Sequence, residues 1–159
     1  MIETLVSYEH RTAGFSLPLP ESWQAVEDPQ PAVPLVALEP DRGGIFRCNV
    51  VVSVDQVPEG LDVAGWQAGA EPMMRQAMQD FLLLDLEELQ VGGRPAMYRL
   101  AHHLVPDLGP VTMAQWMLLR AGRGHTLTFS IGTMEYETRA DLFVDIARGF
   151  RFAESGGEN

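Results

Sequence analysis

Four histidines are the first side chains in the sequence that could carry acid–base or metal chemistry. His102 and His103 are adjacent in an apolar stretch that predicts a strand, so their side chains point to opposite faces and cannot hold one ion together. His10 and His125 lie near expected turns, and no two histidines have the spacing of zinc ligands. The histidines therefore predict neither a metal site nor a cofactor site.

The remaining candidates for catalysis are one cysteine, six serines and a pair of neighbouring carboxylates. Cys48 alternates with Phe46 and Val50, which predicts a buried strand thiol rather than a reactive one. None of the serines lies in a strand–turn–helix nucleophile elbow. Glu87 and Glu88 could act as general acid and base, but solvated carboxylates at an irregular strand edge explain them more simply. The sequence predicts no catalytic residue and a protein that is not an enzyme.

Charge and composition exclude further classes of function. The chain has 22 acidic and 11 basic residues, a formal net charge of −11, and every basic residue is an arginine. The absence of lysine excludes Schiff-base chemistry and the phosphate-binding lysine of a P-loop. Contacts with nucleic-acid phosphates need clustered positive charge, so the acidic balance argues against a nucleic-acid partner.

Length and hydropathy predict a single domain without a membrane span. With 159 residues and 46% hydrophobic content the chain can bury one sizeable core, which we place over residues 1–153, with a frayed tail at 154–159. No stretch approaches the ~20 apolar residues that a membrane span needs. The first six residues lack the basic segment and apolar run of a signal peptide, so we expect a cytoplasmic protein that is secreted only if a leader has been removed.

The first half of the chain predicts short strands and one helix. Apolar patterns predict strands at 15–17 and 33–38 and a longer one over 46–57. Pro72 removes a backbone donor inside the expected helix, so we predict a kink or two short helices. Asp62 can cap this helix, and its apolar residues recur at spacings of three and four: Val63, Trp66, Ala70, Met73 and Ala77.

Beyond Phe81 the pattern predicts an antiparallel meander of four strands. Gly92-Gly93 predicts a two-residue turn in its first hairpin. Strict pairing from that turn would mix apolar and polar side chains on both faces. A β-bulge at Glu87–Glu88 removes the conflict and sets Asp85 opposite Arg99 as an ion pair.

The next two turns are expected to place Val105 opposite Val111 and Arg120 opposite His125. These registers make one face of the meander uniformly apolar, and a slip of one residue would destroy that agreement. We therefore place the main core on this face, formed by Ala96, Tyr98, Leu100, Ala114, Trp116, Leu118, Leu127, Phe129 and Ile131.

The reverse face of the meander mixes methionines with polar side chains. Met97, Met113 and Met117 are flexible and polarizable, which suits a surface that accepts varied apolar shapes. One interpretation is that the preceding helix covers them as a second core layer. The other is that Arg99 and Gln115, which would need partners if buried, mark a surface where a peptide, a helix or a second subunit binds.

The C-terminal segment predicts a second helix. Thr138 is a candidate N-cap, Phe143 belongs to an apolar side, and Gly149 is a suitable terminator. Residues 150–152 are expected to pack back onto the sheet.

Several segments of the chain together form a familiar pattern: Phe15–Trp23, Asn49–Val54, a mid-chain helix, Gly92–Ala96, Gln115-Trp116, Thr126–Phe129 and a final helix running into Gly149-Phe150. This pattern resembles the PsbP-like α/β/α fold and, within it, the bacterial DcrB-like and actinobacterial LpqN/LpqT-like proteins. The resemblance covers residues 8–152, and the exclusive use of arginine is similar to that of GC-rich actinobacterial genomes.

This resemblance implies a mostly non-enzymatic class of protein. It contains photosystem accessory subunits, a Ran-binding transport factor, envelope lipoproteins, and chaperones of type VI secretion effectors. Such proteins offer a sheet face or a sheet edge to another protein. We expect this chain, which shows no lipoprotein leader or lipid-modified cysteine, to be more similar to the leaderless chaperones.

We therefore predict an α+β protein, an α/β/α sandwich with an antiparallel sheet of about six or seven strands and helices on both faces. The predicted function is non-enzymatic protein binding, as an adaptor or a chaperone-like accessory factor, with another protein or a second copy as partner. Met97, Met113 and Met117 would supply adaptable apolar contact, and Arg99 and Gln115 would orient the partner.

Two alternatives remain open. One is a module that binds a small apolar ligand in a pocket between the helix at 62–79 and the sheet. The other is a hydrolase that uses a histidine and a carboxylate.

Overall fold

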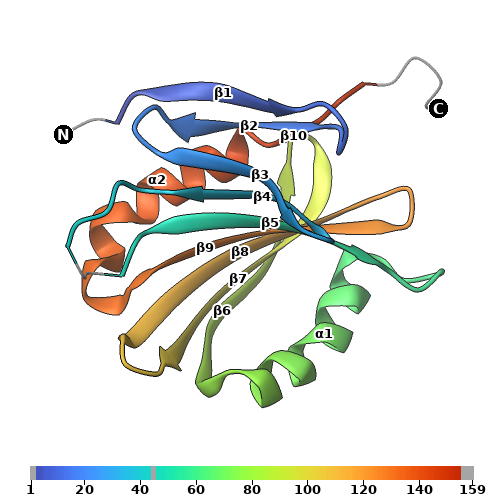
Figure 1. Cartoon of the computed structure of the whole chain (residues 1–159). Helices are drawn as coiled ribbons and strands as arrows, with labels where there is room; N and C mark the ends of the chain where they lie inside the picture. The colour runs from blue at the N-terminus through green and yellow to red at the C-terminus, as the bar shows by residue number, and fades with distance from the viewer. Residues whose placement is uncertain (1–2, 44–45, 155–159) are drawn as a thin grey trace.

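A seven-stranded antiparallel sheet forms the middle layer of the computed structural model, which describes residues 3–43 and 46–154 (Figure 1). Its strands lie in the order β3-β4-β5-β9-β8-β7-β6, so β3 and β6 are the edges. Their bounds are β3 Gln24–Gln30, β4 Val33–Leu38, β5 Asn49–Gln56, β6 Gln79–Val91, β7 Arg94–Val105, β8 Gly109–Arg120 and β9 Arg123–Gly132.

Helices lie on both faces of this sheet (Figure 1). Helix α2 shares one side with a three-stranded sheet, and α1 lies on the other side. The predicted sandwich is therefore confirmed, but the small sheet was not predicted, because its last strand has two residues and pairs with β2 instead of the main sheet. The bounds of these elements are β1 Leu5–His10, β2 Phe15–Pro20, β10 Arg151–Phe152, α1 Val63–Ala77, the 3-10 helix η1 Thr133–Glu135 and α2 Tyr136–Arg148.

The main core lies between the seven-stranded sheet, β2 and α2. Every residue predicted for the core face of the meander belongs to this cluster or packs against it. Phe129 stacks on Phe143 of α2 with ring centroids 4.9 Å apart, and Trp116 meets Phe129 edge-on at 5.4 Å. Cys48 is buried here as predicted, and burial raises the pKa of its thiol to about 12.

The β-bulge of the first hairpin does not lie where the sequence placed it. Strict pairing continues past Glu87–Glu88 and sets Asp85 opposite Leu100, and the register shifts between Leu83 and Asp85 and again between Gln79 and Leu82. The predicted ion pair between Asp85 and Arg99 is therefore wrong, because the two side chains are on opposite faces. An edge strand tolerates apolar and polar side chains on the same face, since its outer edge is open to solvent.

The other two hairpins of the meander are two residues tighter than predicted. Positive φ angles at Asp107 and Ala121 allow these short turns. Because side chains alternate with a period of two, an error of two residues leaves every side chain on its predicted face. The observed pairs are Val105 with Gly109, where Val111 was expected, and Arg120 with Arg123, where His125 was expected.

Helix α1 is one continuous helix that packs on the sheet through its N-terminal half. Asp62 caps it as predicted, since its Oδ1 accepts a 2.8 Å hydrogen bond from the backbone N–H of Gly65. Pro72 lies inside this helix, so of the two predicted outcomes, a kink or two short helices, the division into two helices does not occur. Met73, predicted for the buried side, is 72% exposed. The buried residues of the helix are Val63, Trp66 and Gln67.

Helix α2 begins earlier than predicted. It starts at Tyr136 directly after η1, and the expected cap, Thr138, instead donates a 2.7 Å hydrogen bond from its first turn to the carbonyl of Glu135. Gly149 ends the helix as expected. Within the described residues neither helix is long and apolar enough to cross a membrane. Of the predicted frayed tail only Glu154 is described, and the rest lies outside the described residues.

The contact between α1 and β9 provides a test of how the helix is held. The indole ring of Trp66 fills the place that a Cβ atom of Gly124 would take. We expect Gly124→Ala to push the N-terminal half of α1 off the sheet and to lower the free energy of unfolding by about 1–3 kcal/mol. The measurement is urea-induced unfolding followed by tryptophan fluorescence.

Gly132→Ala is the matched control for this variant. It adds the same methyl group to the same strand, at a place with no atom within 4 Å of the new Cβ. Equal losses of stability in the two variants would contradict the proposed role of the Trp66 contact.

Candidate functional site

The five residues predicted to bind a partner lie together on the reverse face of the meander and are all buried, and α1 contacts three of them, Met97, Arg99 and Met117. Met97 and Met117 pack against Val63 and Trp66 of the helix in a second hydrophobic cluster. In this arrangement the reverse face is a second core layer, which was the first of the two interpretations. The exposed fractions are 4% for Met97, 2% for Arg99, 2% for Met113, 6% for Gln115 and 2% for Met117.

Arg99 joins α1 to the sheet through a row of buried polar groups. Its Nε donates to Oε1 of Gln115 at 2.7 Å, and its Nη1 donates to Oε1 of Gln67 on α1 at 2.9 Å. Gln115 donates in turn to Oγ1 of Thr128 at 2.9 Å. Burial lowers the pKa of the guanidinium to about 10, and in the described part of the chain no carboxylate pairs with it directly. Amide oxygens therefore stabilise this buried cation.

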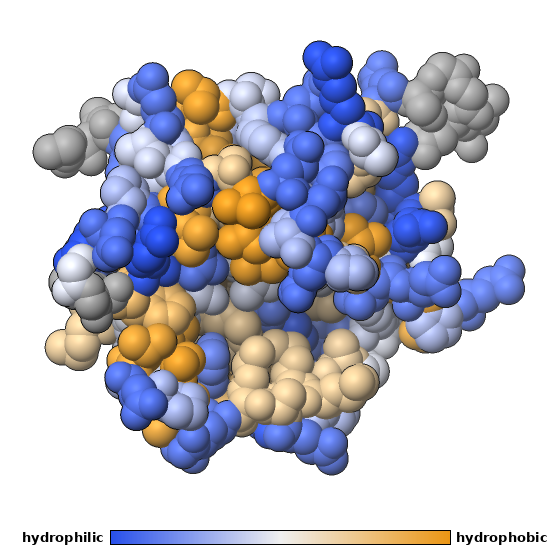
Figure 2. Space-filling model, viewed as in Figure 1, coloured by the Kyte–Doolittle hydropathy of each residue, from blue (hydrophilic) through white to orange (hydrophobic). Residues whose placement is uncertain are grey.

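The C-terminal half of α1 is attached to the sheet more weakly. No residue of the helix beyond Gln67 is buried, and the ion pair between Glu71 and Arg75, 3.1 Å long, stays within the helix. The lower part of Figure 2, where Figure 1 places α1, shows a pale orange surface of weakly apolar side chains. A partner reaches the five covered residues only if α1 lifts from the sheet.

A pocket of about 610 Å³ opens beside the N-terminal end of α1. Val63 of the helix and Leu89, Ala96 and Leu119 of the sheet form its apolar part, while Arg94 is one of its polar residues. The alternative site for a small apolar ligand was expected between the helix at 62–79 and the sheet, and this pocket touches only the first three residues of that range.

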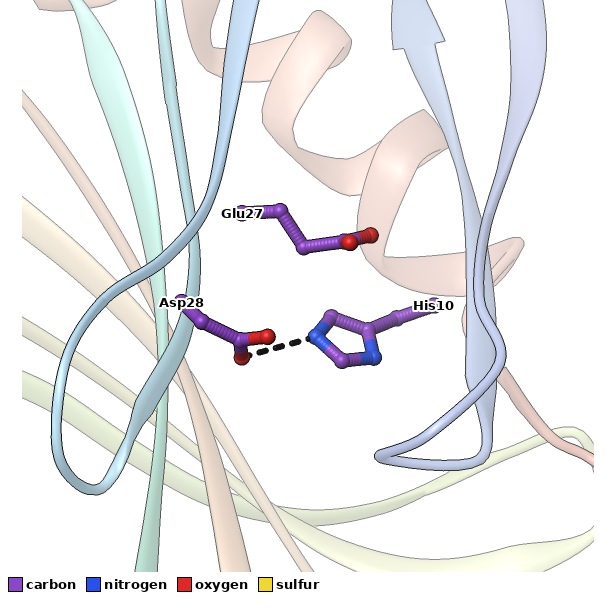
Figure 3. A group of neighbouring side chains, drawn as sticks. All are labelled: His10, Glu27 and Asp28. Atoms are coloured by element: carbon purple, nitrogen blue, oxygen red, sulfur yellow. Dashed lines mark hydrogen bonds and ion pairs between the residues drawn. The ribbon is translucent and has the colours of Figure 1, made fainter.

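His10, Glu27 and Asp28 form a group with the composition of a metal site (Figure 3). One ligand atom from each residue lies within 4.8 Å of the others. Nε2 of His10 is 2.9 Å from Oδ1 of Asp28, and its Nδ1 accepts a 2.9 Å hydrogen bond from the backbone N–H of Ala13. This group could not be predicted from the sequence, because β1 and β3 lie apart in sequence and no ligand spacing connects them.

The hydrogen bonds of His10 oppose both metal binding and general-base catalysis. Because Nδ1 accepts from Ala13, the proton of the neutral ring is on Nε2 and is donated to Asp28. A metal on Nε2 would move that proton to Nδ1, against the N–H of Ala13. Neither ring nitrogen is free to take a proton from a substrate. The group holds the turn between β1 and β2 against β3.

The side chains of His102 and His125 contact residues of other strands. His102 lies opposite Leu82, and its Nδ1 is 2.8 Å from Oγ1 of Thr112. His125 is 5% exposed, and its ring meets Phe152 edge-on with centroids 4.8 Å apart. Burial, and to a smaller extent the charge of nearby arginines, lowers the pKa of His125 to about 4. In the described residues no histidine side chain is hydrogen-bonded to a serine or a cysteine.

Strand β6 is an exposed edge of the seven-stranded sheet. It is 13 residues long and, within residues 3–43 and 46–154, pairs with β7 alone. Leu82, Leu84 and Leu86 on this strand are 55%, 44% and 39% exposed. A long edge with exposed apolar side chains can pair with another chain, so β6 is a candidate docking site. Its exposed acidic residues are Asp80, Asp85, Glu87 and Glu88.

Comparison with known proteins finds likeness in structure only. No family model matches the chain, and no curated protein matches its sequence. Cyanobacterial PsbP (CyanoP) from Synechocystis sp. PCC 6803 is similar in structure, with a TM-score of 0.72 and 18% identity over 96% of this chain and 94% of that one.

Two further solved structures have the same fold. LpqN of Mycobacterium tuberculosis, described as involved in cell envelope biogenesis, has a TM-score of 0.72 and 15% identity over 95% of this chain and 91% of that one. The Ran-binding protein Mog1p of Saccharomyces cerevisiae has a TM-score of 0.68 and 12% identity over 96% and 97%. The chain therefore has the PsbP-like fold that its sequence predicted.

The burial of the methionines predicts what happens when one of them becomes charged. We expect Met117→Asp to lower the free energy of unfolding by about 3 kcal/mol or more, because the carboxylate would lie beneath α1 without a partner. Met134→Asp is the control, since Met134 is 93% exposed and its change should stay within about 0.5 kcal/mol. Urea unfolding measures both. A stable, folded Met117→Asp protein would show that the reverse face is open in solution.

The low pKa of His125 predicts how stability depends on pH. Because the folded pKa of about 4 lies below the ordinary value, the unfolded chain binds a proton first as the pH falls, and acid destabilises the fold. Between about pH 7.5 and pH 5.5 the wild type should lose about 1 kcal/mol more than His125→Gln. Urea unfolding at the two pH values measures the difference, and identical losses would contradict the assignment.

Proposed function

We propose that this protein is a non-enzymatic accessory domain that binds another protein, as an adaptor or a chaperone-like factor. The partner contributes an extended segment that adds to the sheet at β6. The observation that carries the proposal is the unpaired edge of β6 with its exposed leucines. An added strand forms main-chain hydrogen bonds with such an edge, and side-chain contacts on either face supply specificity.

The side chains of β6 define the chemistry of the segment that fits there. Leu82, Leu84 and Leu86 offer apolar contacts on both sides of the strand, because the bulge changes which face its residues occupy. The acidic residues of the strand lie among these leucines and are exposed. A matching segment is therefore apolar and carries basic residues, since opposite charges on facing strands are favourable and like charges are not.

The comparisons support a binding role without identifying the partner. Mog1p is a Ran-binding protein, and its fold is that of this chain. The fold alone does not transfer a partner, because one fold serves many functions. The hydrogen bonds of His10 supply independent support, since they leave no free base at the group most similar to a catalytic site.

The proposal also includes contacts between the partner and the five covered residues of the reverse face. Met97, Arg99, Met113, Gln115 and Met117 contact a partner only where α1 has moved away. The weakly attached C-terminal half of α1 lies beside β6, so a segment bound at the edge is next to the part of the helix that moves most easily.

Binding of a small apolar ligand in the pocket at the N-terminal end of α1 is a second candidate function. Its apolar lining and its volume of about 610 Å³ suit a small apolar molecule. Thermal-shift measurements with lipids and aromatic metabolites test it, because a bound ligand stabilises the folded state. A stabilising ligand would favour this candidate over strand addition at β6.

The test of strand addition compares two variants with matched changes. We expect Leu82→Gln/Leu84→Gln to capture about tenfold less of the bound proteins from native lysate, because neutral polar side chains replace the apolar contacts. Leu108→Gln/Met134→Gln removes two exposed apolar side chains elsewhere and should capture as much as the wild type. Mass spectrometry quantifies the captured proteins, and hydrogen exchange of the wild type with its partner should show slower exchange in β6.

Two results would contradict the proposal. One is an unchanged set of captured proteins with the β6 variant. The other is slower hydrogen exchange over a different strand on binding.

A further inference from the structure

Three arginines from distant segments line one pocket at the end of the seven-stranded sheet. The pocket measures about 440 Å³ and contains Arg94, Arg120 and Arg151 around Phe152, with Glu154 also in its lining. Arg94 begins β7, Arg120 ends β8, and Arg151 belongs to β10, so tertiary structure alone brings them together.

The guanidinium groups are ordered by contacts within the protein. Arg94 and Arg120 lie over the ring of Phe152, at 4.8 and 5.2 Å from its centroid. Nη1 of Arg94 donates to a backbone carbonyl of β8 at 2.9 Å, and Nη1 of Arg151 donates to two backbone carbonyls at 2.6 and 2.7 Å. Because these side chains are already held, binding of an anion costs less side-chain entropy than on a flexible surface.

The chain's own carboxylates leave part of this charge unpaired. In the described residues no carboxylate forms an ion pair with Arg94 or Arg151. Arg94, Arg120 and Arg123 lower the pKa of the neighbouring His125, as concentrated positive charge does. Concentrated positive charge in a chain of net charge −11 points to an anionic ligand. Among the described arginines, those that form ion pairs with carboxylates include Arg11, Arg42, Arg75 and Arg139.

We propose that this arginine pocket binds carboxylate groups of a short acidic segment of a partner protein. A guanidinium presents a planar fork of N–H donors that matches a carboxylate. A long, dense polyanion would also meet the acidic remainder of the surface, whereas a short segment meets the pocket alone. Glu154 in the lining likewise disfavours a densely charged ligand. The pocket is separate from the leucines of β6, so this inference does not depend on strand addition.

The test uses a fluorescein-labelled peptide of alternating aspartate and glutamate residues, with fluorescence anisotropy at low ionic strength. We expect the wild type to bind and Arg94→Gln/Arg151→Gln to bind about tenfold more weakly. Arg11→Gln/Arg75→Gln is the matched control, because it removes the same charge from arginines outside the pocket and should keep the wild-type affinity. Both substituted arginines are exposed, so thermal unfolding should show that the variant is folded.

Absence of binding by the wild type, or equal weakening in the control variant, would overturn the proposal. A second arm replaces the peptide by single-stranded DNA of the same charge, and tighter binding of DNA would overturn the assignment to an acidic protein segment. Sedimentation velocity forms the third arm. Self-association of the wild type that is lost in Arg94→Gln/Arg151→Gln would make a second copy the ligand and would equally overturn it.

Discussion

A buried positive charge determines where α1 lies. Arg99 is 2% exposed, and removing a guanidinium from water is costly unless polar atoms surround it. The sheet supplies one acceptor from Gln115, and α1 supplies the other from Gln67. Trp66, one residue earlier on the helix, fills the space beside Gly124. The polar and the apolar contact therefore require the same position of the helix, and that position closes the reverse face of the sheet.

Closure of both faces limits where a partner can bind. The main core covers one face with α2 and β2, and α1 covers the other. The remaining parts of the sheet are its edge strands and its ends, where side chains and main-chain groups meet solvent. The leucines of β6 lie on an edge strand, and the arginine pocket lies at an end of the sheet. A partner can therefore bind at either surface without disturbing the two hydrophobic cores.

The sequence was sufficient to assign the side chains of the meander to faces, and insufficient to show what covers them. Alternation survives a register error of two residues, so Trp116 and Met117 were placed on the correct faces although their predicted partners were wrong. The bulge was misplaced because an exposed edge strand does not enforce alternation. The partner of Arg99 was missed because Gln67 lies 32 residues away on another element. The arginine pocket was missed for the same reason, since its residues share no spacing.

The acidic residues of β6 also bear on whether two copies of the chain pair. If two β6 strands met antiparallel about a twofold axis, each would present Asp85, Glu87 and Glu88 to the same acidic strand of the other copy. Facing like charges are unfavourable, and a net charge of −11 on each molecule opposes their approach. Pairing with a basic, apolar segment is favourable, because its charges pair with those carboxylates while its apolar side chains contact the leucines. The residues that protect this edge against a second copy therefore also select a partner strand of opposite charge.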